Sequence, residues 1–243
     1  MLKPKCSLSI VIPVFNEAGS ILQVLQKVAE YQNCNSLVST QTIVVDDGST
    51  DESVEILLNE PTLYTQLIKL RENKGKGAAI RKALEIVSTD YILIQDSDAE
   101  YSPHEYVKYF DYIVTLSPDL LLTSRFSGSE ITRVHYFWHK VGNKVITLIF
   151  NLLHNTTFTD IYSGHVIFKK NLVDPRQLRV NRWGQQAELL SLICTQRPAM
   201  FEIPISYFGR TYEQGKKIRA WHIIEVIYAI FKSRLIVKNN ENR

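Results

Sequence analysis

The first 105 residues alternate short apolar segments with amphipathic ones, and this alternation restricts the possible folds more than any other feature. Apolar, partly β-branched runs occur at Leu8–Phe15, Thr42–Val45, Leu63–Leu70 and Tyr91–Gln95. Each run is followed by polar residues and then by a segment with apolar residues at helical spacing. Strands that alternate with helices in this way form parallel βαβ units with right-handed crossovers. We therefore predict a single α/β domain, Rossmann-like, with a mostly parallel sheet flanked by helices.

Three helix starts are expected from local signals. Ser20 with Gln23, and Ser49 with Glu52, have the spacing of a capping box. The segment 102–105 reads Ser-Pro-His-Glu, with Pro103 at the first helical position.

The composition is that of an ordinary globular protein. Its 243 residues are 45% hydrophobic and 22% charged, and the net charge of +3 gives no reason to expect nucleic acid. The three cysteines, Cys6, Cys34 and Cys194, are scattered and predict reduced, buried thiols in a cytosolic protein. We expect no signal peptide, and no run reaches the ~18 apolar residues of a membrane span.

Polar residues follow each of the four predicted strands. They are Asn16-Glu17, Asp46-Asp47, Asn73-Lys74 and Asp96-Ser97-Asp98. The carboxyl ends of parallel strands meet at one edge of the sheet, where open α/β sheets bind ligands. We expect a binding site at this edge, although Asp46 and Asp47 could also be turn formers.

Three carboxylates, Asp96, Asp98 and Glu100, follow the fourth strand at intervals of two residues. In an extended chain this spacing places all three on one side. Mg²⁺ and Mn²⁺ prefer oxygen ligands and are commonly held by one or two carboxylates together with substrate phosphates. The stretch therefore predicts a platform for a metal and a diphosphate; the alternative is a solvated acidic turn.

The Gly-rich phosphate-binding motifs are missing. Neither G-x-G-x-x-G nor G-x-x-x-x-G-K-[ST] occurs in the chain. Phosphates are therefore expected to be held by the metal and by Lys or Arg. Lys74 and Lys76 are candidates, while Gly75 and Gly77 could serve a tight turn into the next helix.

Several motifs together resemble those of family 2 glycosyltransferases with the GT-A fold, and more closely the dolichyl-phosphate mannose synthase-like branch. In the first half they are I-V-I-P-V-F-N-E, V-V-D-D-G-S-T-D, N-K-G-K-G-A-A-I-R-K-A-L and Q-D-S-D-A-E-Y. The second half adds S-R-F, T-D-I-Y-S-G and I-P-I-S-Y-F-G-R-T-Y-E-Q-G-K-K. The resemblance covers roughly Ser9 to Lys217.

The resemblance implies roles for individual residues. The nucleotide base and ribose would contact Pro13, Phe15, Glu17, Val45 and Asp47. Asp96, Ser97 and Asp98 match the motif that holds metal and diphosphate, and Glu100 matches a further metal-side position. Catalytic roles fall to Asp98 and to basic residues around the sugar diphosphate, which are Arg125, Arg210 and Lys216. Lys76 is expected to contact the nucleotide-sugar as well, without a catalytic role.

The chain departs from the family pattern at four places. Phe15 stands where Tyr is usual, and Glu100 where Gln is common. The pair His165-Val166 replaces an aromatic-Arg pair, and Gly215-Lys216-Lys217 replaces Gly-Ser-Lys.

The resemblance implies inverting, Mg²⁺- or Mn²⁺-dependent transfer of a hexose from GDP-mannose or UDP-glucose to a polyprenyl or dolichyl phosphate. A hydroxyl acceptor usually needs a general base, whereas a phosphate is already anionic. The stretch Trp183–Leu190 holds only one acid, Glu188, which could equally be a helix residue paired with a cation. A hydroxyl-acceptor glycosyltransferase, a sugar-phosphate nucleotidyltransferase and a catalytically silent binding module remain as alternatives.

Two apolar segments are candidates for contact with lipid. Val145–Leu153 is apolar on nearly all sides, which suits a core helix or a membrane-facing one. Trp221–Val237 combines apolar residues with Lys232 and Arg234, which suits an amphipathic helix at a membrane interface. We therefore expect a glycosyltransferase domain over residues 1–217 and an interfacial helix over 218–243, with the protein peripheral on the cytosolic face of a membrane.

Overall fold

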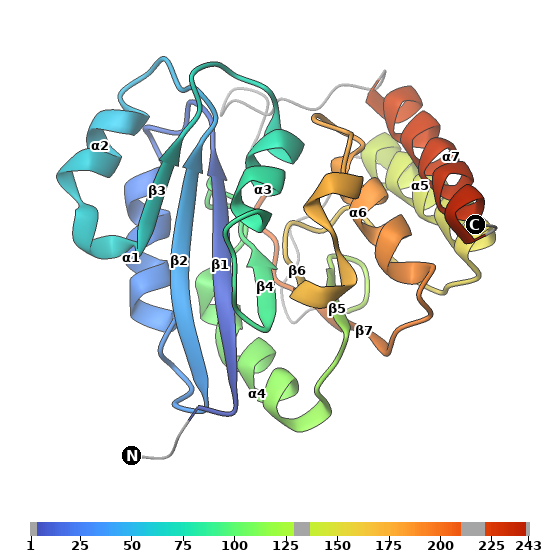
Figure 1. Cartoon of the computed structure of the whole chain (residues 1–243), viewed down its shortest axis with the longest axis horizontal. Helices are drawn as coiled ribbons and strands as arrows, with labels where there is room; N and C mark the ends of the chain where they lie inside the picture. Colours follow the sequence, from blue (N-terminus) through green and yellow to red (C-terminus); the bar gives the residue numbers. More distant parts are fainter. Residues whose placement is uncertain (1–3, 129–136, 210–221, 242–243) are drawn as a thin grey trace.

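The computed structural model describes residues 4–128, 137–209 and 222–241, and the side chains of the last helix over residues 225–234. The described strands form a seven-stranded sheet in the order β3-β2-β1-β4-β6-β5-β7 (Figure 1). Their bounds are β1 Cys6–Val14, β2 Val38–Asp46, β3 Gln66–Lys69, β4 Tyr91–Ile94, β5 Leu120–Ser124, β6 Val166–Lys169 and β7 Met200–Pro204.

The first four strands are parallel, as predicted. β1 pairs with β2 and β4, and β2 pairs with β3. The third strand is shorter than the expected Leu63–Leu70 because Pro61–Leu63 forms a 3-10 turn, with the proline at its first position.

The second half adds an antiparallel strand that the sequence did not indicate. β6 runs antiparallel to both of its neighbours, β4 and β5, and β7 then pairs parallel with β5. The sheet is therefore mostly parallel, and β4 lies at its centre between β1 and β6.

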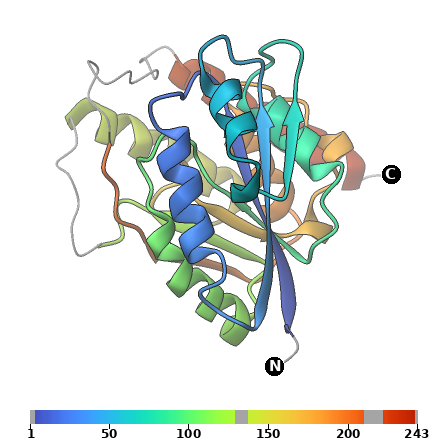
Figure 2. The same ribbon diagram turned by 90° about the vertical axis from the view of Figure 1, so that its left-hand side faces the viewer.

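Helices cover both faces of the sheet. On one face lie α1 (Ile21–Tyr31), α2 (Ser53–Asn59) and α4 (Tyr106–Leu116), in front of the sheet in Figure 2. On the other lie α3 (Lys76–Leu84), α5 (Phe137–His154), α6 (Gln185–Cys194) and α7 (His222–Glu241).

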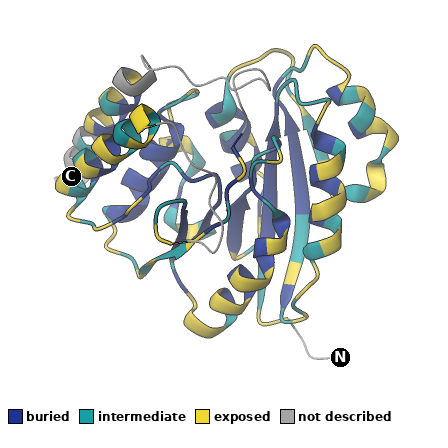
Figure 3. Cartoon of the chain, turned by 180° about the vertical axis from the view of Figure 1, so that it is seen from behind, coloured by how far each residue is buried: buried dark blue, intermediate teal, exposed yellow. Residues whose placement is uncertain are grey.

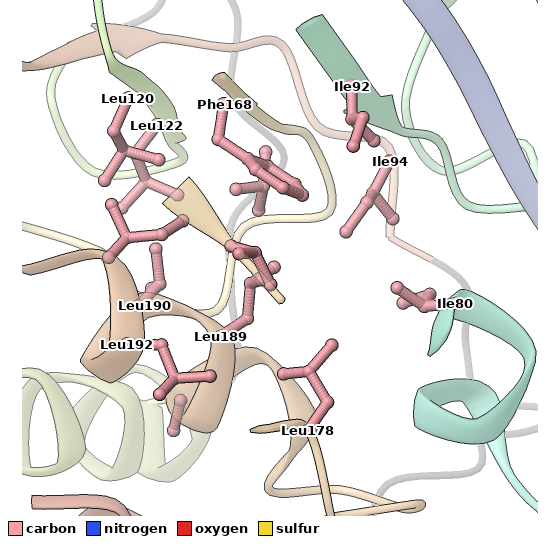
Figure 4. Close-up of a cluster of buried hydrophobic side chains, with 14 of the residues drawn as sticks. Ile80, Ile92, Ile94, Leu120, Leu122, Phe168, Leu178, Leu189, Leu190 and Leu192 are labelled. Carbon is pink, nitrogen blue, oxygen red and sulfur yellow. The ribbon is translucent and has the colours of Figure 1, made fainter. Parts of the chain in front are cut away.

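Each strand of the sheet supplies side chains to both faces. In β1, Leu8, Ile10 and Ile12 pack toward α1 and α4, whereas Val11 belongs to the α3 side. The cluster beneath α3 and α6 joins Ile80 to Leu189 and Leu190 across strand residues such as Ile94 (Figure 4). Strands β1, β4, β5 and β6 are buried over most of their length, α6 is buried throughout, and the other helices expose their outer faces (Figure 3). The result is a three-layer arrangement that fixes the strand ends in space.

The expected helix starts are correct only in part. Ser20 is the residue before α1, but its hydroxyl makes no capping bond and lies instead 2.8 Å from the carbonyl oxygen of Ser97. α2 begins at Ser53 without a side-chain cap, so the predicted box at Ser49 is wrong. Before α4, Ser102 caps the 3-10 turn Pro103–Glu105 by accepting the N–H of His104, as expected.

The cysteines are free, and the predicted burial holds only for Cys194. Cys34 is exposed and Cys6 is half-buried. The expected domain boundary at residue 217 lies outside the described residues.

Candidate active site

A cavity of about 440 Å³ lies at the carboxyl ends of β1, β2 and β4. β1 and β4 are neighbours although three helices and two strands separate them in the chain, so the strand order reverses between them. The cavity is lined by Pro13, Val14, Phe15, Glu17, Asp47, Asn73, Gly75, Lys76, Asp96, Ser97, Asp98, Glu100, Tyr101, Arg125, Tyr162, Gly164, Arg182, Trp183, Gln185, Gln186 and Tyr207. Most predicted contact residues are therefore brought together at one place.

The three predicted metal ligands lie in a turn that follows β4, which we call the acid loop (residues 96–101). The expected extended conformation is wrong, because β4 ends at Ile94 and the chain then turns. Ala99 has φ +59°, in the left-handed region, and the N–H of Glu100 donates to Oδ1 of Asp98 at 3.1 Å. The turn rather than strand alternation gives all three carboxylates access to the cavity.

Each end of the acid loop is joined to a neighbouring element. The ammonium of Lys76, at the start of α3, donates to the carboxylate of Asp96. The hydroxyl of Tyr207 donates to Oε2 of Glu100 at 2.8 Å, and burial raises the pKa of this tyrosine. Tyr101 and Tyr207 also form an antiparallel bridge, so the segment after β7 lies along the loop.

The acid loop offers the ligand chemistry of a hard divalent cation. Its donors are carboxylate oxygens, and all three line the cavity. Within the described residues, no three His, Cys, Asp or Glu side chains are arranged to hold a metal by themselves. This fits a cation held by one or two carboxylates together with ligand phosphates, with Asp98, Asp96 and Glu100 as the residues that would hold it.

Predicted nucleoside contacts line the cavity at the carboxyl ends of β1 and β2. Pro13, Phe15 and Glu17 line it from the end of β1, and Asp47 lines it from the end of β2. The Asp47 carboxylate accepts the N–H groups of Lys74 at 2.9 Å and Gly75 at 2.7 Å. Burial raises the pKa of Asp47, and these two backbone bonds oppose that shift.

Two residues at the end of β2, Val45 and Asp46, do not line the cavity. Val45 is completely buried in the core on the α3 side and does not contribute to the lining. Asp46 accepts the N–H of Ser49 at 3.2 Å, which is the turn-forming role that the sequence left open.

Among the basic candidates, Arg125 lines the cavity and Lys74 does not. Arg125 forms a two-pronged ion pair with Asp160, with Nε at 2.6 Å from Oδ2 and Nη2 at 2.9 Å from Oδ1. Asp160 is completely buried, and the guanidinium also lies 5.2 Å from the centre of the Tyr207 ring. Lys74 pairs with Glu72 on the surface. Arg210 and Lys216 lie outside the described residues.

One wall of the cavity was not predicted from the sequence. It consists of Arg182, Trp183, Gln185 and Gln186, just before and within the first turn of α6. Gly77 permits this wall to approach α3, because a Cβ there would lie 2.2 Å from the carbonyl oxygen of Val180. Gln186 donates to the carbonyl oxygens of Ile161 at 3.0 Å and Ser163 at 2.7 Å. The sequence signal that could have indicated this wall is Trp183, which stands beside polar residues at the start of a helix.

Glu188, the acid that was considered as a general base, is not among the residues that line the cavity. Its carboxylate is buried and accepts the N–H groups of Arg179 at 3.0 Å and Val180 at 2.8 Å. Burial raises its pKa, and the backbone bonds oppose this shift. Glu188 therefore supports the loop before α6: its hydrogen bonds are to backbone groups, and the charges of Arg81 and Lys232 also oppose the rise in its pKa.

Comparison with known proteins identifies the family. The model of glycosyl transferase family 2 matches residues 9–174. The chain belongs to this family. It is 28% identical to the glycosyltransferase AglJ of Haloferax volcanii over 206 residues, which are 83% of this chain and 63% of that protein. The chain thus spans less than two thirds of that relative.

Two other similar proteins have names that mention a lipid phosphate. A UDP-N-acetylglucosamine–dolichyl-phosphate N-acetylglucosaminyltransferase of Methanococcus voltae is 24% identical, covering 93% of this chain and 95% of that protein. An undecaprenyl-phosphate 4-deoxy-4-formamido-L-arabinose transferase of Salmonella choleraesuis is 25% identical, covering 88% of this chain and 63% of that protein.

The GT-A fold expectation is confirmed by solved structures. Glucosyl-3-phosphoglycerate synthase from Mycobacterium tuberculosis, solved with Mn²⁺, UDP and glucosyl-3-phosphoglycerate, has a TM-score of 0.67 and 18% identity. The alignment covers 94% of this chain and 80% of that one. At this identity the likeness establishes the fold.

No helix in the described parts of the chain combines the length and the apolar character of a membrane span.

Proposed function

We propose that the protein transfers a hexose from a nucleotide-sugar to a polyprenyl phosphate, with inversion at the anomeric carbon and with Mg²⁺ or Mn²⁺ as cofactor. GDP-mannose and UDP-glucose are the candidate donors. The names of the archaeal and bacterial relatives support a lipid-phosphate acceptor. The Mn²⁺ and UDP in the Mycobacterium tuberculosis structure support a divalent cation beside the donor diphosphate.

The distribution of acids around the cavity carries this proposal. The five carboxylates among its described lining residues all follow β1, β2 or β4, and they are Glu17, Asp47, Asp96, Asp98 and Glu100. The wall before α6 presents amides and an arginine instead. A hydroxyl acceptor bound against that wall would lack a base from it, whereas a phosphate acceptor is already an anion and needs none.

The chain's own residues account for the other requirements of the reaction. The acid loop would orient the donor diphosphate, and a cation held there would supply Lewis-acid stabilisation of the leaving group. Lys76 and Arg125 add positive charge at the same cavity, with Arg125 held in place by Asp160. Arg210 and Lys216 are proposed to add further charge around the sugar diphosphate.

A membrane-facing surface is proposed on α5 and α7, which lie side by side (Figure 1). The large exposed apolar side chains of these helices are Phe137, Trp138, Val145, Leu148, Leu152, Tyr228 and Phe231. Lys140, Lys144 and Lys232 are exposed on the same two helices, which suits a surface with anionic lipid. We propose that the protein acts as a peripheral enzyme on the cytosolic face of a membrane, and this surface supports the membrane contact alone.

A radiolabelled transfer assay tests the proposed reaction. GDP-mannose and UDP-glucose are offered in turn, with Mn²⁺ or Mg²⁺, to the protein and membranes that contain a polyprenyl phosphate. Label that enters the organic phase from one donor supports the proposal and identifies the sugar. Donor consumption without lipid label supports a hydroxyl acceptor instead, and a donor left intact contradicts the proposal.

A further inference from the structure

The acid loop adopts a conformation that its own sequence does not enforce. It follows β4 without being a strand or a helix, and Ala99 takes a left-handed φ of +59° without being a glycine. A non-glycine residue in this region is held there by its surroundings, because the isolated backbone disfavours it. Contacts that fix the loop therefore decide where its carboxylates lie.

One buried side chain contacts both ends of the loop. Gln95 is completely buried, and its Nε2 lies 2.9 Å from the carbonyl oxygen of Asp96 and 3.4 Å from that of Tyr101. An amide nitrogen carries two hydrogens, so it can donate to both carbonyls at once. Gln95 thus connects the first residue of the acid loop to the last.

The amide of Gln95 is in turn oriented from α4. The hydroxyl of Tyr106, itself completely buried, donates to Oε1 of Gln95 at 2.8 Å. This bond makes the amide oxygen the acceptor and leaves the nitrogen to face the loop. The Tyr106 ring is fixed by packing against Phe110, with ring centres 5.7 Å apart.

Burying the polar groups of Gln95 and Tyr106 costs free energy unless they are hydrogen-bonded. An amide and a phenol placed in an apolar core must be desolvated, and apolar side chains of similar size would fill the same space without that cost. Here the polar groups are satisfied by one another and by the loop. The hydrogen bonds therefore favour one loop conformation over the alternatives.

We propose that Gln95 and Tyr106 are positioning residues that set the conformation of the acid loop, and through it the affinity of the site for a divalent cation bound with a nucleoside diphosphate. This inference rests on the proposed function. The loop has other anchors that do not involve this pair, among them the Ser20 hydroxyl at the carbonyl oxygen of Ser97 and the N–H of Phe208 at that of Glu100. Because they remain in place, loss of the pair weakens binding without abolishing it.

The chain provides a matched control on the same helix. Tyr109 is also completely buried in α4, but its hydroxyl bonds to Nδ1 of His165 at 2.8 Å and not to the loop. Tyr106→Phe and Tyr109→Phe each remove one buried hydroxyl and keep the ring. Gln95→Leu removes the amide itself at nearly constant volume.

Three measurements on the full chain separate positioning from general stability. Mn²⁺ binding is followed by electron paramagnetic resonance with UDP and with GDP, loop dynamics by hydrogen exchange of residues 96–101, and stability by urea unfolding. We expect Tyr106→Phe and Gln95→Leu to weaken Mn²⁺ binding by about 10-fold, as is typical for residues that orient metal ligands, and to speed exchange in the loop. Tyr109→Phe should lose stability while keeping wild-type Mn²⁺ affinity and loop exchange.

Two results would overturn the inference. The first is that Tyr106→Phe keeps the Mn²⁺ affinity and the loop exchange rate of the wild type. The second is that Tyr106→Phe and Tyr109→Phe lose Mn²⁺ affinity, and speed loop exchange, to the same extent. If the wild-type protein failed to bind Mn²⁺ in the presence of UDP and also in the presence of GDP, the proposed function would fail instead. Loop exchange without nucleotide would still decide whether the pair fixes the loop.

Discussion

At the scale of single residues, two basic side chains of the cavity are paired with carboxylates. Lys76 contacts Asp96, and Arg125 contacts Asp160. Removing one member of such a pair leaves the other charge uncompensated, and the cost rises with burial. Substitutions at the site should therefore separate into those that affect binding and those that affect folding.

Asp98 belongs to the first group. Asp98→Ala should lower transfer by about 100-fold or more, because the carboxylate proposed to hold the cation beside the leaving group is lost. The unfolding free energy should stay close to that of the wild type, since Asp98 lies in an open turn at the cavity. The transfer assay and urea unfolding measure both quantities, and full activity in this variant would exclude Asp98 as a metal ligand.

Asp160 belongs to the second group. Asp160→Asn should destabilise the protein by about 3–5 kcal/mol, because it leaves Arg125, whose side chain is only 11% exposed, without its counter-charge. Asp174→Asn is the control, since its partner Arg176 is 89% exposed and an ion pair at the surface contributes little to stability. Urea unfolding of both variants tests the contrast, which equal losses would refute.

At the scale of elements, the sequence predicted the first four strands and their helices because each combines an apolar run with a helical face. It did not indicate β6 or its antiparallel direction, because the apolar pattern of a strand carries no information on the direction in which it pairs. The acid loop was predicted as a site, but its geometry was not, because Ala99 carries no signal for a left-handed φ. Ser20 was misread as a cap because its hydroxyl is used in a contact with Ser97, 77 residues away.

Partners distant in sequence account for the missed site residues as well. Asp160 lay within a recognised motif, but only the fold brings its carboxylate to Arg125. The same holds for Tyr207, whose partner Glu100 lies 107 residues earlier. Spacing along the chain contains no information on such pairs.

The exposed face of α5 and α7 yields a prediction at this scale. Leu148→Glu should weaken binding to vesicles that contain anionic lipid by at least about fivefold, because one unfavourable charge near such a surface costs ~1 kcal/mol. Leu58→Glu on α2 is the control, since Leu58 is 54% exposed and Leu148 57% exposed. The helices that carry them, α2 and α5, lie on opposite sides of the molecule (Figure 1). Vesicle sedimentation gives the comparison, and equal binding by both variants would argue against this face.

At the scale of the whole molecule, buried histidines couple stability to pH. Burial and the nearby Lys76 lower the pKa of His165 to about 3, and burial lowers that of His154 to about 4. An unfolded histidine, with a pKa near 6.5, takes up a proton as the pH falls, while these two stay neutral in the fold. Each therefore removes stability between pH 6.5 and its folded pKa, by up to ~1.4 kcal/mol per pH unit.

His165→Phe tests this coupling. The variant loses the bond to Tyr109 and should be less stable at pH 7.5, but its stability should fall less on going to pH 5. The difference between the two proteins in that fall should be about 2 kcal/mol, because 1.5 pH units lie below pH 6.5. Urea unfolding at pH 7.5, 6 and 5 measures it, and parallel pH profiles would show that His165 does not titrate as described.

The bond between Tyr207 and Glu100 also has a consequence for how the protein is synthesised and folds. The acid loop is synthesised 107 residues before the tyrosine that completes it. At ~5–20 residues per second on the ribosome, this separation corresponds to ~5–20 s. A nascent chain can form β1 to β4 during that interval, but its cavity lacks the segment after β7. The cavity therefore acquires its complete lining only after the segment that follows β7 has been synthesised.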